Sequence, residues 1–200
     1  MVSTETTNSA SVKNVIHSAQ RTGVFVDVQN IYHSAKNLYR AHVNFSELMK
    51  TVVAGRPLIR AVAYVVRSET VLEDVDIKSR GEGSFFEALK KNGLELRLKD
   101  LQVYADGMKK ADWDVGMAVD AIRMANFLDV VVLVTGDGDF VPLVEYLKWG
   151  MGRFVEVASF SKTTSTRLRD ATDRFVELDS VPKILLRNAK GRSRKGTERR

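Results

Sequence analysis

The chain contains no cysteine among its 200 residues. Disulfide bonds, thiolate zinc sites and cysteine nucleophiles are therefore excluded, and the fold must be held together by packing alone. Long apolar runs are missing from the N-terminus: residues 1–20 are polar and rich in Ser and Thr, without the apolar stretch of a signal peptide or a membrane span. We therefore expect a cytoplasmic protein with no membrane partner, in which residues 1–21 form a flexible N-terminal tail.

Motifs for nucleotide cofactors are missing as well, since neither a P-loop nor a GxGxxG sequence occurs. Histidine is scarce, and His17, His33 and His42 do not have the spacing of metal ligands. We expect these three side chains at the surface.

The positive charge of the chain is concentrated at its C-terminus. With 44% hydrophobic residues, the chain can bury the core of one ordinary domain, expected over residues 22–180, followed by a basic flexible tail over 181–200. Residues 187–200 carry seven Lys or Arg and one Glu, which leaves 24 basic and 24 acidic residues in 1–186. Such a tail attracts polyanions without reading sequence, or serves only to keep the chain in solution. The basic side chains assigned to nucleic-acid binding are Arg187, Lys190, Arg192, Arg194 and Lys195.

Short apolar runs alternate along the chain with segments of helical periodicity. The runs predict strands over 23–28, 58–66, 94–104, 129–134, 154–160 and, as a sixth candidate, 174–179. The helical segments are 29–41, 44–54, 85–92, 113–127, 141–149 and 164–171. Strands that alternate with helices pair in parallel through right-handed crossovers. The predicted fold is therefore α/β, a three-layer α/β/α sandwich with a mainly parallel, Rossmann-like sheet.

Local signals mark some boundaries of these elements. Asn44 and Ser84 are each followed three residues later by Glu, a pattern that predicts helix starts. In the helix over 113–127, apolar residues recur at Val115, Ala118, Ile122 and Ala125. Residues 67–83 are charged and punctuated by Gly, which predicts a mobile surface loop.

Aspartates gather where two of the predicted strands end. The stretch VLVTGDGDF, residues 132–140, runs a buried strand into a turn that carries both Asp137 and Asp139, although one Asp is enough for a turn. Asp27 ends the first strand, and Asp114 begins the helix that leads into the fourth. Ligands of a parallel sheet bind beyond the carboxyl ends of its strands, where the strand order reverses. If the first and fourth strands are neighbours there, these four carboxylates converge.

Converging carboxylates repel one another and raise one another's pKa unless a hard cation neutralises them. Magnesium or manganese fits best, because both prefer oxygen ligands and complete their shell with water and substrate phosphate. A metal held in this way lowers the pKa of a bound water, orients it toward phosphorus and stabilises the leaving oxygen. We therefore take Asp27, Asp114, Asp137 and Asp139 as candidate metal ligands and catalytic residues for phosphodiester hydrolysis.

Each aspartate also has a purely structural explanation. Asp139, and Asp112 or Asp114, could cap helices, and Asp137 could be a turn residue. Asp27 is harder to explain in this way, because a carboxylate at the end of a buried strand needs a partner. Asp120 lies six residues after Asp114, about 240° further round the helix, so a straight helix cannot aim both at one point.

Two further side chains could support the chemistry. Asn30 stands three residues after Asp27, where its amide could position a water or a phosphate. Lys110 could contact phosphate, although a lysine in a KK pair is more often solvated.

Three segments in this order resemble the NYN domain, in the LabA-like or DUF88 branch of the PIN-like nuclease group. They are VFVDVQNIY (24–32), KKADWDVGMAVDAI (109–122) and VLVTGDGDFVPLVE (132–145), and the likeness covers roughly residues 23–179. The resemblance implies a PIN-like α/β/α sandwich, a metal-binding acidic pocket and RNA cleavage as the expected activity.

The resemblance also assigns residues by motif. Asp27 and Asn30 match its first strand signature, and Asp114 and Asp120 match its K…D…D helix. Asp137 and Asp139 match its S/T-G-D-G-D-F turn, with Thr135 in the Ser/Thr place. Lys110 stands one residue further from Asp114 than in many relatives, with Asp112 inserted, so the role of Lys110 is open.

The leading hypothesis is a magnesium- or manganese-dependent, (endo)ribonuclease-like hydrolase, whose basic tail recruits RNA that we expect to be single-stranded. The sequence leaves open whether it cuts as an endo- or an exonuclease. The alternative is a non-catalytic regulatory module that keeps the acidic pocket to bind RNA or a partner. A phosphatase of the haloacid-dehalogenase type would need a second Asp in a D-x-D pattern, where this chain has Asp27-Val28-Gln29. The oligomeric state, including a homodimer, is left open by the sequence.

Overall fold

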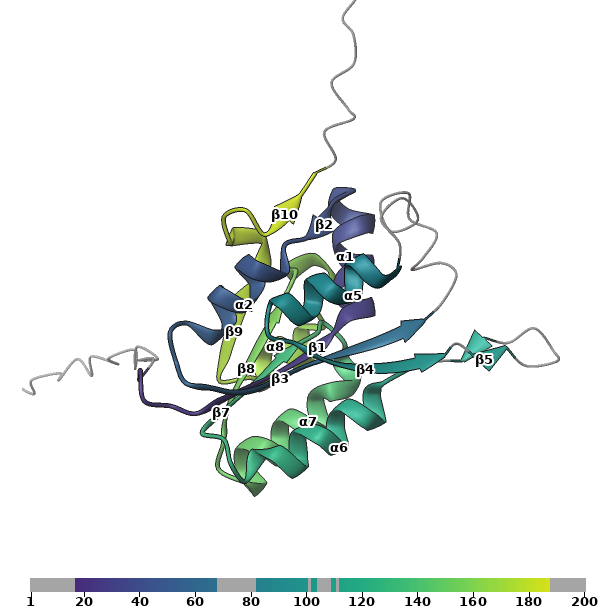
Figure 1. Ribbon diagram of the computed structural model, residues 1–200. Helices are drawn as coiled ribbons and strands as arrows, with labels where there is room; N and C mark the ends of the chain where they lie inside the picture. Colours follow the sequence, from purple (N-terminus) through teal and green to yellow (C-terminus); the bar gives the residue numbers. More distant parts are fainter. Residues whose placement is uncertain (1–16, 68–81, 101, 104–108, 111, 188–200) are drawn as a thin grey trace, which may run out of the picture.

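A six-stranded parallel sheet, in the order β4-β3-β1-β7-β8-β9, forms the centre of the molecule (Figure 1). The computed structural model describes residues 17–67, 82–100, 102–103, 109–110 and 112–187. The strands are β1 (Thr22–Asp27), β3 (Leu58–Arg67), β4 (Glu95–Asp100), β7 (Val130–Val134), β8 (Phe154–Ser159) and β9 (Arg174–Glu177). The predicted α/β fold with a mainly parallel sheet is confirmed.

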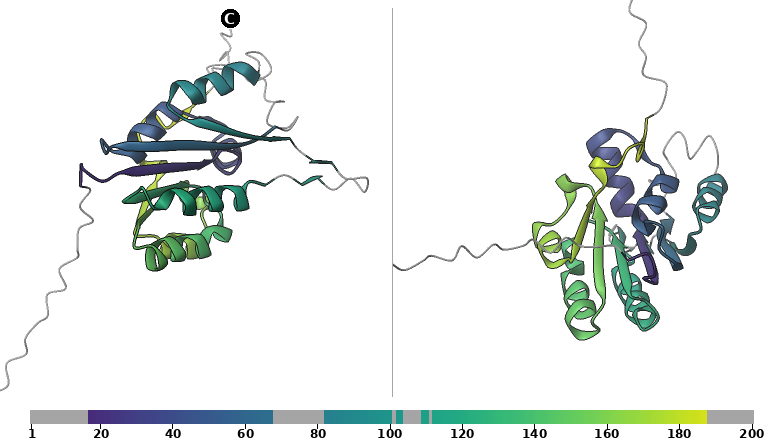
Figure 2. Two further views of the ribbon diagram at one scale, coloured as in Figure 1. Left: turned by 60° about the horizontal axis from the view of Figure 1, so that its bottom comes forward. Right: turned by 90° about the vertical axis from the view of Figure 1, so that its left-hand side faces the viewer.

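Helices cover both faces of this sheet and complete the three layers (Figure 2). One face carries α1 (Val28–Tyr39), α2 (Phe45–Val53) and α5 (Glu82–Lys91). The other carries α6 (Asp114–Ala125), α7 (Val141–Glu145) and α8 (Thr166–Ala171). Short helical turns are η1 (Gly138–Phe140), η3 (Ser161–Thr163) and η4 (Leu178–Ser180), and α7 continues as the π-helical segment η2 (Tyr146–Gly150).

Alternate residues of the central strands supply two separate cores. Val24 and Val26 of β1 pack with the helices α1 and α2, whereas Phe25 packs with α6 and α7. A strand covered on both faces reads as a nearly continuous apolar run, which is why β1 could be predicted. Gly23 allows β1 to pack closely against Leu128, because a Cβ at this position would lie 2.4 Å from Leu128 Cδ1 and would force that side chain to shift.

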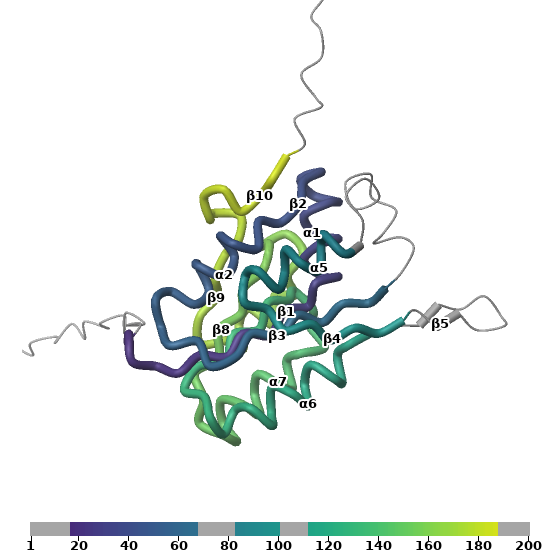
Figure 3. The backbone as a smooth tube through the Cα atoms, in the orientation of Figure 1, coloured from purple at the N-terminus to yellow at the C-terminus, as the bar shows by residue number. Residues whose placement is uncertain are grey.

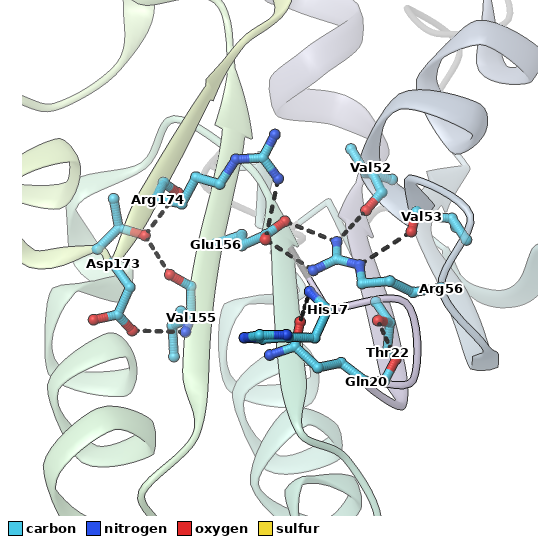
Figure 4. Close-up of polar contacts among 11 residues, drawn as sticks. His17, Gln20, Thr22, Val52, Val53, Arg56, Val155, Glu156, Asp173 and Arg174 are labelled. Carbon is cyan, nitrogen blue, oxygen red and sulfur yellow. Dashed lines mark hydrogen bonds and ion pairs between the residues drawn. The ribbon is translucent and has the colours of Figure 1, made fainter. Parts of the chain in front are cut away.

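A buried ion pair connects the end of α2 to β8 (Figure 4). The side chains of Arg56 and Glu156 are both 0% exposed. The two terminal nitrogens of the Arg56 guanidinium each lie 2.9 Å from a different carboxylate oxygen of Glu156. Arg174 adds a third contact to Glu156 at 3.2 Å. Arg56 also donates to the carbonyl oxygens of Val52 and Val53, so it satisfies the last turn of α2.

Two short antiparallel pairs were not predicted. They are β2 (His42–Val43) with β10 (Leu185–Leu186), which lie side by side in Figure 3, and β5 (Gln102–Val103) with β6 (Lys109–Lys110). A strand of two residues carries no measurable periodicity.

The pairing of β10 corrects the expected C-terminal boundary. Ile184 is only 2% exposed, and its carbonyl accepts from the Asn44 N–H at 2.7 Å. Residues 181–187 therefore belong to the folded unit, and Arg187 lies exposed at its end. The other tail residues assigned to nucleic acid, Lys190, Arg192, Arg194 and Lys195, lie outside the described residues.

The remaining boundary predictions had mixed outcomes. Asn44 is an N-cap, because its Oδ1 accepts from the N–H groups of Ser46 and Glu47. Ser84 is not a cap, because α5 begins two residues earlier. Residues 1–16 of the expected N-terminal tail, and 68–81 of the expected loop, lie outside the described residues. No helix in the described ranges is both long and apolar enough to span a membrane.

Candidate metal centre

The strand order reverses at β1 and β7, which are neighbours at the centre of the sheet. From β1 the chain crosses to β3 on one side, and from β7 it crosses to β8 on the other. Val26 pairs with Val134, so Asp27 and Thr135 follow side by side, and the Thr135 hydroxyl donates to Asp27 Oδ2 at 3.4 Å. The predicted adjacency of the first and fourth strands is confirmed, and this edge is where an α/β sheet binds ligands.

Asp27 combines a structural role with an unfavourable electrostatic position. Its Oδ1 accepts from the Asn30 N–H at 3.1 Å, so it caps α1. Burial nevertheless raises the pKa of Asp27, and the charges of Asp114 and Asp137 raise it too, so that its pKa is about 6 despite the lowering effect of the hydrogen bonds from the Asn30 N–H and the Thr135 hydroxyl. The helix cap alone does not account for a carboxylate held in this position.

The loop after β7 is held in one shape by its own hydrogen bonds and by the segment after β8. The Thr135 hydroxyl accepts from the Asp137 N–H at 3.2 Å, and Asp137 Oδ1 accepts from the Asp139 N–H at 3.0 Å. Asn30 Oδ1 accepts from the Gly136 N–H at 2.9 Å, which ties α1 to the loop. A Cβ at Gly136 would lie 2.9 Å from the Thr163 carbonyl oxygen and 3.2 Å from Thr164 Cα, so this close approach of two backbone segments requires glycine.

Three carboxylates from two elements meet in front of this loop. Asp114, Asp137 and Asp139 each offer an oxygen, and these oxygens lie within 4.8 Å of one another. We call these residues the acidic triad. Burial raises the pKa of Asp114, and the charges of Asp137, Asp112 and Asp139 raise it further. Within the described residues, no Lys or Arg forms an ion pair with any member of the triad.

The donor set of the triad suits a hard divalent cation. Carboxylate oxygens are preferred by Mg²⁺ and Mn²⁺, and neither needs a nitrogen or sulfur ligand. A cation would also remove the repulsion that raises the pKa of Asp114. The residues present therefore fit the metal that the sequence predicts, with Asp27 beside the triad rather than among its three oxygens.

The other predicted site residues lie around this centre. The Asp120 carboxylate accepts from the Tyr64 hydroxyl at 3.0 Å and pairs with Arg97 at 3.4 Å, so it is directed away from the triad. Asp112 is exposed and acts on Asp114 through its charge. Lys110 belongs to β6, and its side chain lies outside the described part of the chain.

Trp113 fixes the start of α6, a role that the sequence did not reveal. Its indole N–H donates to the Val65 carbonyl at 3.1 Å, and its ring lies 5.6 Å from that of Tyr64. A Cβ at Gly116 would lie 2.6 Å from the Trp113 ring. Because Asp114 is the next residue, this packing determines where its carboxylate lies. In the sequence, this role of Trp113 is indicated only by the small residue Gly116 three positions later.

An apolar groove of about 340 Å³ opens from the triad between α6 and α7. Asp114 and Asp139 form its acidic end. Its apolar walls include Val115, Ala118 and Ile122 of α6, with Pro142, Leu143 and Tyr146 opposite. The periodicity of α6 was interpreted correctly as helical, but the residues that α6 buries fully in the core are Met117, Ala121 and Ala125.

Comparisons with known proteins found similar chains by family, by sequence and by overall fold. The family model of the NYN domain matches residues 21–179. The low amplitude and bright protein LabA of Synechococcus elongatus is 28% identical over 173 residues, which cover 80% of this chain and 85% of LabA. A crystal structure of a protein of unknown function from Vibrio parahaemolyticus is 33% identical, with a TM-score of 0.73, and the match covers 86% of this chain and 99% of that one.

Proposed function

The chain belongs to the NYN domain family, as a LabA-like member, and on that premise we propose that it is a divalent-metal-dependent ribonuclease. Its reaction is hydrolysis of a phosphodiester bond in single-stranded RNA by water. The observation that carries this proposal is the acidic triad. Three carboxylates from two elements lie together at the switch point of a parallel sheet, without a paired cation among the described residues.

Asp114, Asp137 and Asp139 would hold Mg²⁺ or Mn²⁺ through their carboxylate oxygens. The bound cation would supply the Lewis acidity that activates water and stabilises the leaving oxygen. Asp27 adds a fourth carboxylate, oriented by the Asn30 N–H and the Thr135 hydroxyl. There it would hold the attacking water in position relative to the phosphate.

Asn30 and Thr135 would act as positioning residues. The Asn30 amide ties α1 to the Gly136 N–H, and the Thr135 hydroxyl contacts both Asp27 and the Asp137 N–H. These bonds hold the carboxylates of two different strands at a constant separation. Preorganisation of this kind lowers the entropy that must be lost when substrate and water are aligned.

RNA would be attracted chiefly by the basic tail over 187–200. The rest of the chain has equal numbers of acidic and basic residues, and its acidic pocket repels phosphate in the absence of metal. The tail therefore supplies the long-range attraction, in a way that depends on salt and not on sequence.

The test is incubation of the purified protein with labelled single-stranded RNA in Mn²⁺, Mg²⁺ or EDTA. Asp27→Asn, Asp114→Asn and Asp137→Asn should each lower the rate more than about 100-fold, because even the outer partners of a metal ligand contribute about 10–100-fold. Asp170→Asn is the matched control, since Asp170 is an exposed aspartate outside the pocket.

Cleavage that needs metal and all three aspartates would support the nuclease. Metal binding without cleavage of any RNA would overturn it and favour the non-catalytic regulatory module. Cleavage that persists in the Asp137→Asn variant would point to a contaminating nuclease or a different site. Circular dichroism of each variant distinguishes a loss of activity from a loss of fold.

A further inference from the structure

The groove between α6 and α7 is continuous with the acidic triad. Asp114 and Asp139 are members of the triad and also line the groove. The two helices run side by side from the same edge of the sheet (Figures 1 and 2). From Asp114 to Ile122 the α6 wall extends about 12 Å, at 1.5 Å per residue. A ligand held at the triad therefore has the groove directly beside it.

The two ends of the groove require two kinds of chemistry in one ligand. At the acidic end a ligand must carry an oxyanion that a bound cation can neutralise. Further along it must present an apolar surface to Val115, Ala118 and Ile122. A nucleotide has both, because its phosphate is the anion and its base has two apolar faces that stack on aromatic side chains. The volume of about 340 Å³ is at the lower end of small-molecule sites, which suits one nucleoside rather than several.

Tyr146 is the groove residue suited to stack on a base. It is 51% exposed and begins the π-helical segment η2, a geometry that is frequent at functional sites. A Cβ at Gly150 would lie 3.1 Å from Tyr146 Cδ2, so the ring lies close against the backbone of its own helix. The Tyr146 ring therefore packs against Gly150, while about half of the residue's surface is exposed to solvent.

A second copy of the chain is the rival occupant, because Val115 is 74% exposed and apolar. In a two-fold symmetric dimer the same patch on each copy meets its equivalent. If the two-fold axis passed close to the acidic end, Asp114 and Asp139 of the two copies would face one another, and like charges at an interface repel. The acidic end therefore favours a ligand that arrives with a cation and a phosphate.

We propose that the α6–α7 groove binds one nucleoside of the RNA, the one that adjoins the phosphate at the acidic triad, with its base stacked on Tyr146. The inference rests on the proposed nuclease function for the position of the phosphate. It adds a binding site for the base, made by residues that take no part in the hydrolysis.

The test compares adenosine 5′-monophosphate with ribose 5-phosphate, each titrated into the full chain in Mg²⁺ and followed by calorimetry. Tyr146→Ala should raise the Kd for adenosine 5′-monophosphate about 5- to 150-fold, which corresponds to the 1–3 kcal/mol contributed by one stacked base. The same variant should leave the Kd for ribose 5-phosphate unchanged, because this probe has no base. Tyr146→Phe keeps the ring and should bind like the wild type. Trp149→Ala is the matched aromatic control, since Trp149 is 83% exposed and does not line the groove.

The outcomes separate this inference from the function on which it rests. If binding depends on the base and on Tyr146 but the protein cleaves no RNA, the base-binding site in the groove would be supported and the proposed nuclease function would be overturned. If cleavage depends on the aspartates, but Tyr146→Ala changes neither the affinity for adenosine 5′-monophosphate nor the KM for RNA, the nuclease function would stand. The proposed base-binding site in the groove would then be overturned. Sedimentation that shows a dimer dissociated by Val115→Glu would also overturn the inference, because the groove would then be an interface between copies.

Discussion

Two groups of charged side chains lie on the central sheet, and within the described residues they differ in whether side chains of opposite charge pair with them. On the α2 face, Glu156 is fully buried between Arg56 and Arg174, and its carboxylate accepts from both (Figure 4). At the carboxyl edge, Asp27 and the acidic triad lie together with no ion pair to Lys or Arg among the described residues. The first group is neutralised by the fold itself, whereas the described residues supply no paired counter-charge to the second. An arrangement that destabilises the folded state is expected at functional sites, which is why the second group indicates function.

Neutralising one carboxylate in each group should give the largest contrast. Glu156→Gln should lower the free energy of unfolding by about 3–5 kcal/mol, because it leaves two arginines, one fully buried, without a counter-charge. Asp137→Asn should not destabilise the metal-free protein, because it removes repulsion and its amide oxygen can still accept from the Asp139 N–H. Urea unfolding in EDTA measures both. Equal destabilisation by the two variants would contradict the distinction.

The pH dependence of stability should report the raised pKa of the Asp27 carboxylate. Its folded pKa of about 6 is above its unfolded value of 3.8, so the folded state binds this proton more tightly. Stability should therefore fall as pH rises from about 4 to about 6, by on the order of 2–3 kcal/mol at 1.36 kcal/mol per pKa unit.

Other groups titrate in the same range, so the difference between wild type and Asp27→Asn isolates the contribution of Asp27. The two proteins should unfold alike near pH 4, and the variant should be the more stable above pH 6 in EDTA. Asp170→Asn should follow the wild type throughout. A constant difference between wild type and Asp27→Asn at every pH would show that Asp27 ionises normally.

Addition of metal should reduce the contrast between the two groups. A ligand that binds only the folded state stabilises it by about 1.4 kcal/mol at ten times its Kd. Mg²⁺ or Mn²⁺ should therefore raise the Tm of the wild type and of Glu156→Gln, but not that of Asp114→Asn or Asp137→Asn. Thermal unfolding with Na⁺ or K⁺ at equal ionic strength controls for general salt effects. A rise in Tm that persists in the Asp137→Asn variant would place the ion elsewhere.

The smallest expected effect concerns the tail beyond β10. Deletion of residues 188–200 leaves Ile184 and its place in the core intact, so the stability should not change. The slope of log K for single-stranded RNA against log salt should become shallower by about 0.7 for each phosphate that the tail neutralises in the wild type. Cleavage at saturating RNA should be unaffected. An unchanged slope would show that the tail does not bind RNA.

Much of the candidate site could be predicted because it depends on short-range rules. A buried apolar run that ends in Asp27, and a second that ends in the GDGD turn, identify two parallel strands and the edge at which both end. The separation of Asp120 from Asp114 followed from helix geometry, and the structure directs Asp120 to Tyr64 and Arg97 instead.

Other features could not be predicted because they depend on partners far away in the chain. The buried face of α6 was only partly identified. Ala125 is in the core, but Val115 and Ile122 have the same periodicity as core residues, and the position of α7 leaves them beside a groove. The partnership of Arg56 with Glu156 spans 100 residues and follows no local pattern. Residues 181–187 resemble the start of a basic tail, and the pairing of β10 with β2 depends on two short segments that meet only in the folded chain.

The amino-acid sequence by itself determined the order of the main strands and helices, the absence of thiol chemistry and the identity of the aspartates at the end of β1 and after β7. These properties depend on composition and on periods of two or about four residues, which are local. Only the tertiary structure decided which three carboxylates lie within 4.8 Å, that Asp27 stands beside them, and that a groove opens next to the triad. The physical reason is that side chains become neighbours through the crossing of helices and strands, and these crossings are set by packing across the whole sheet.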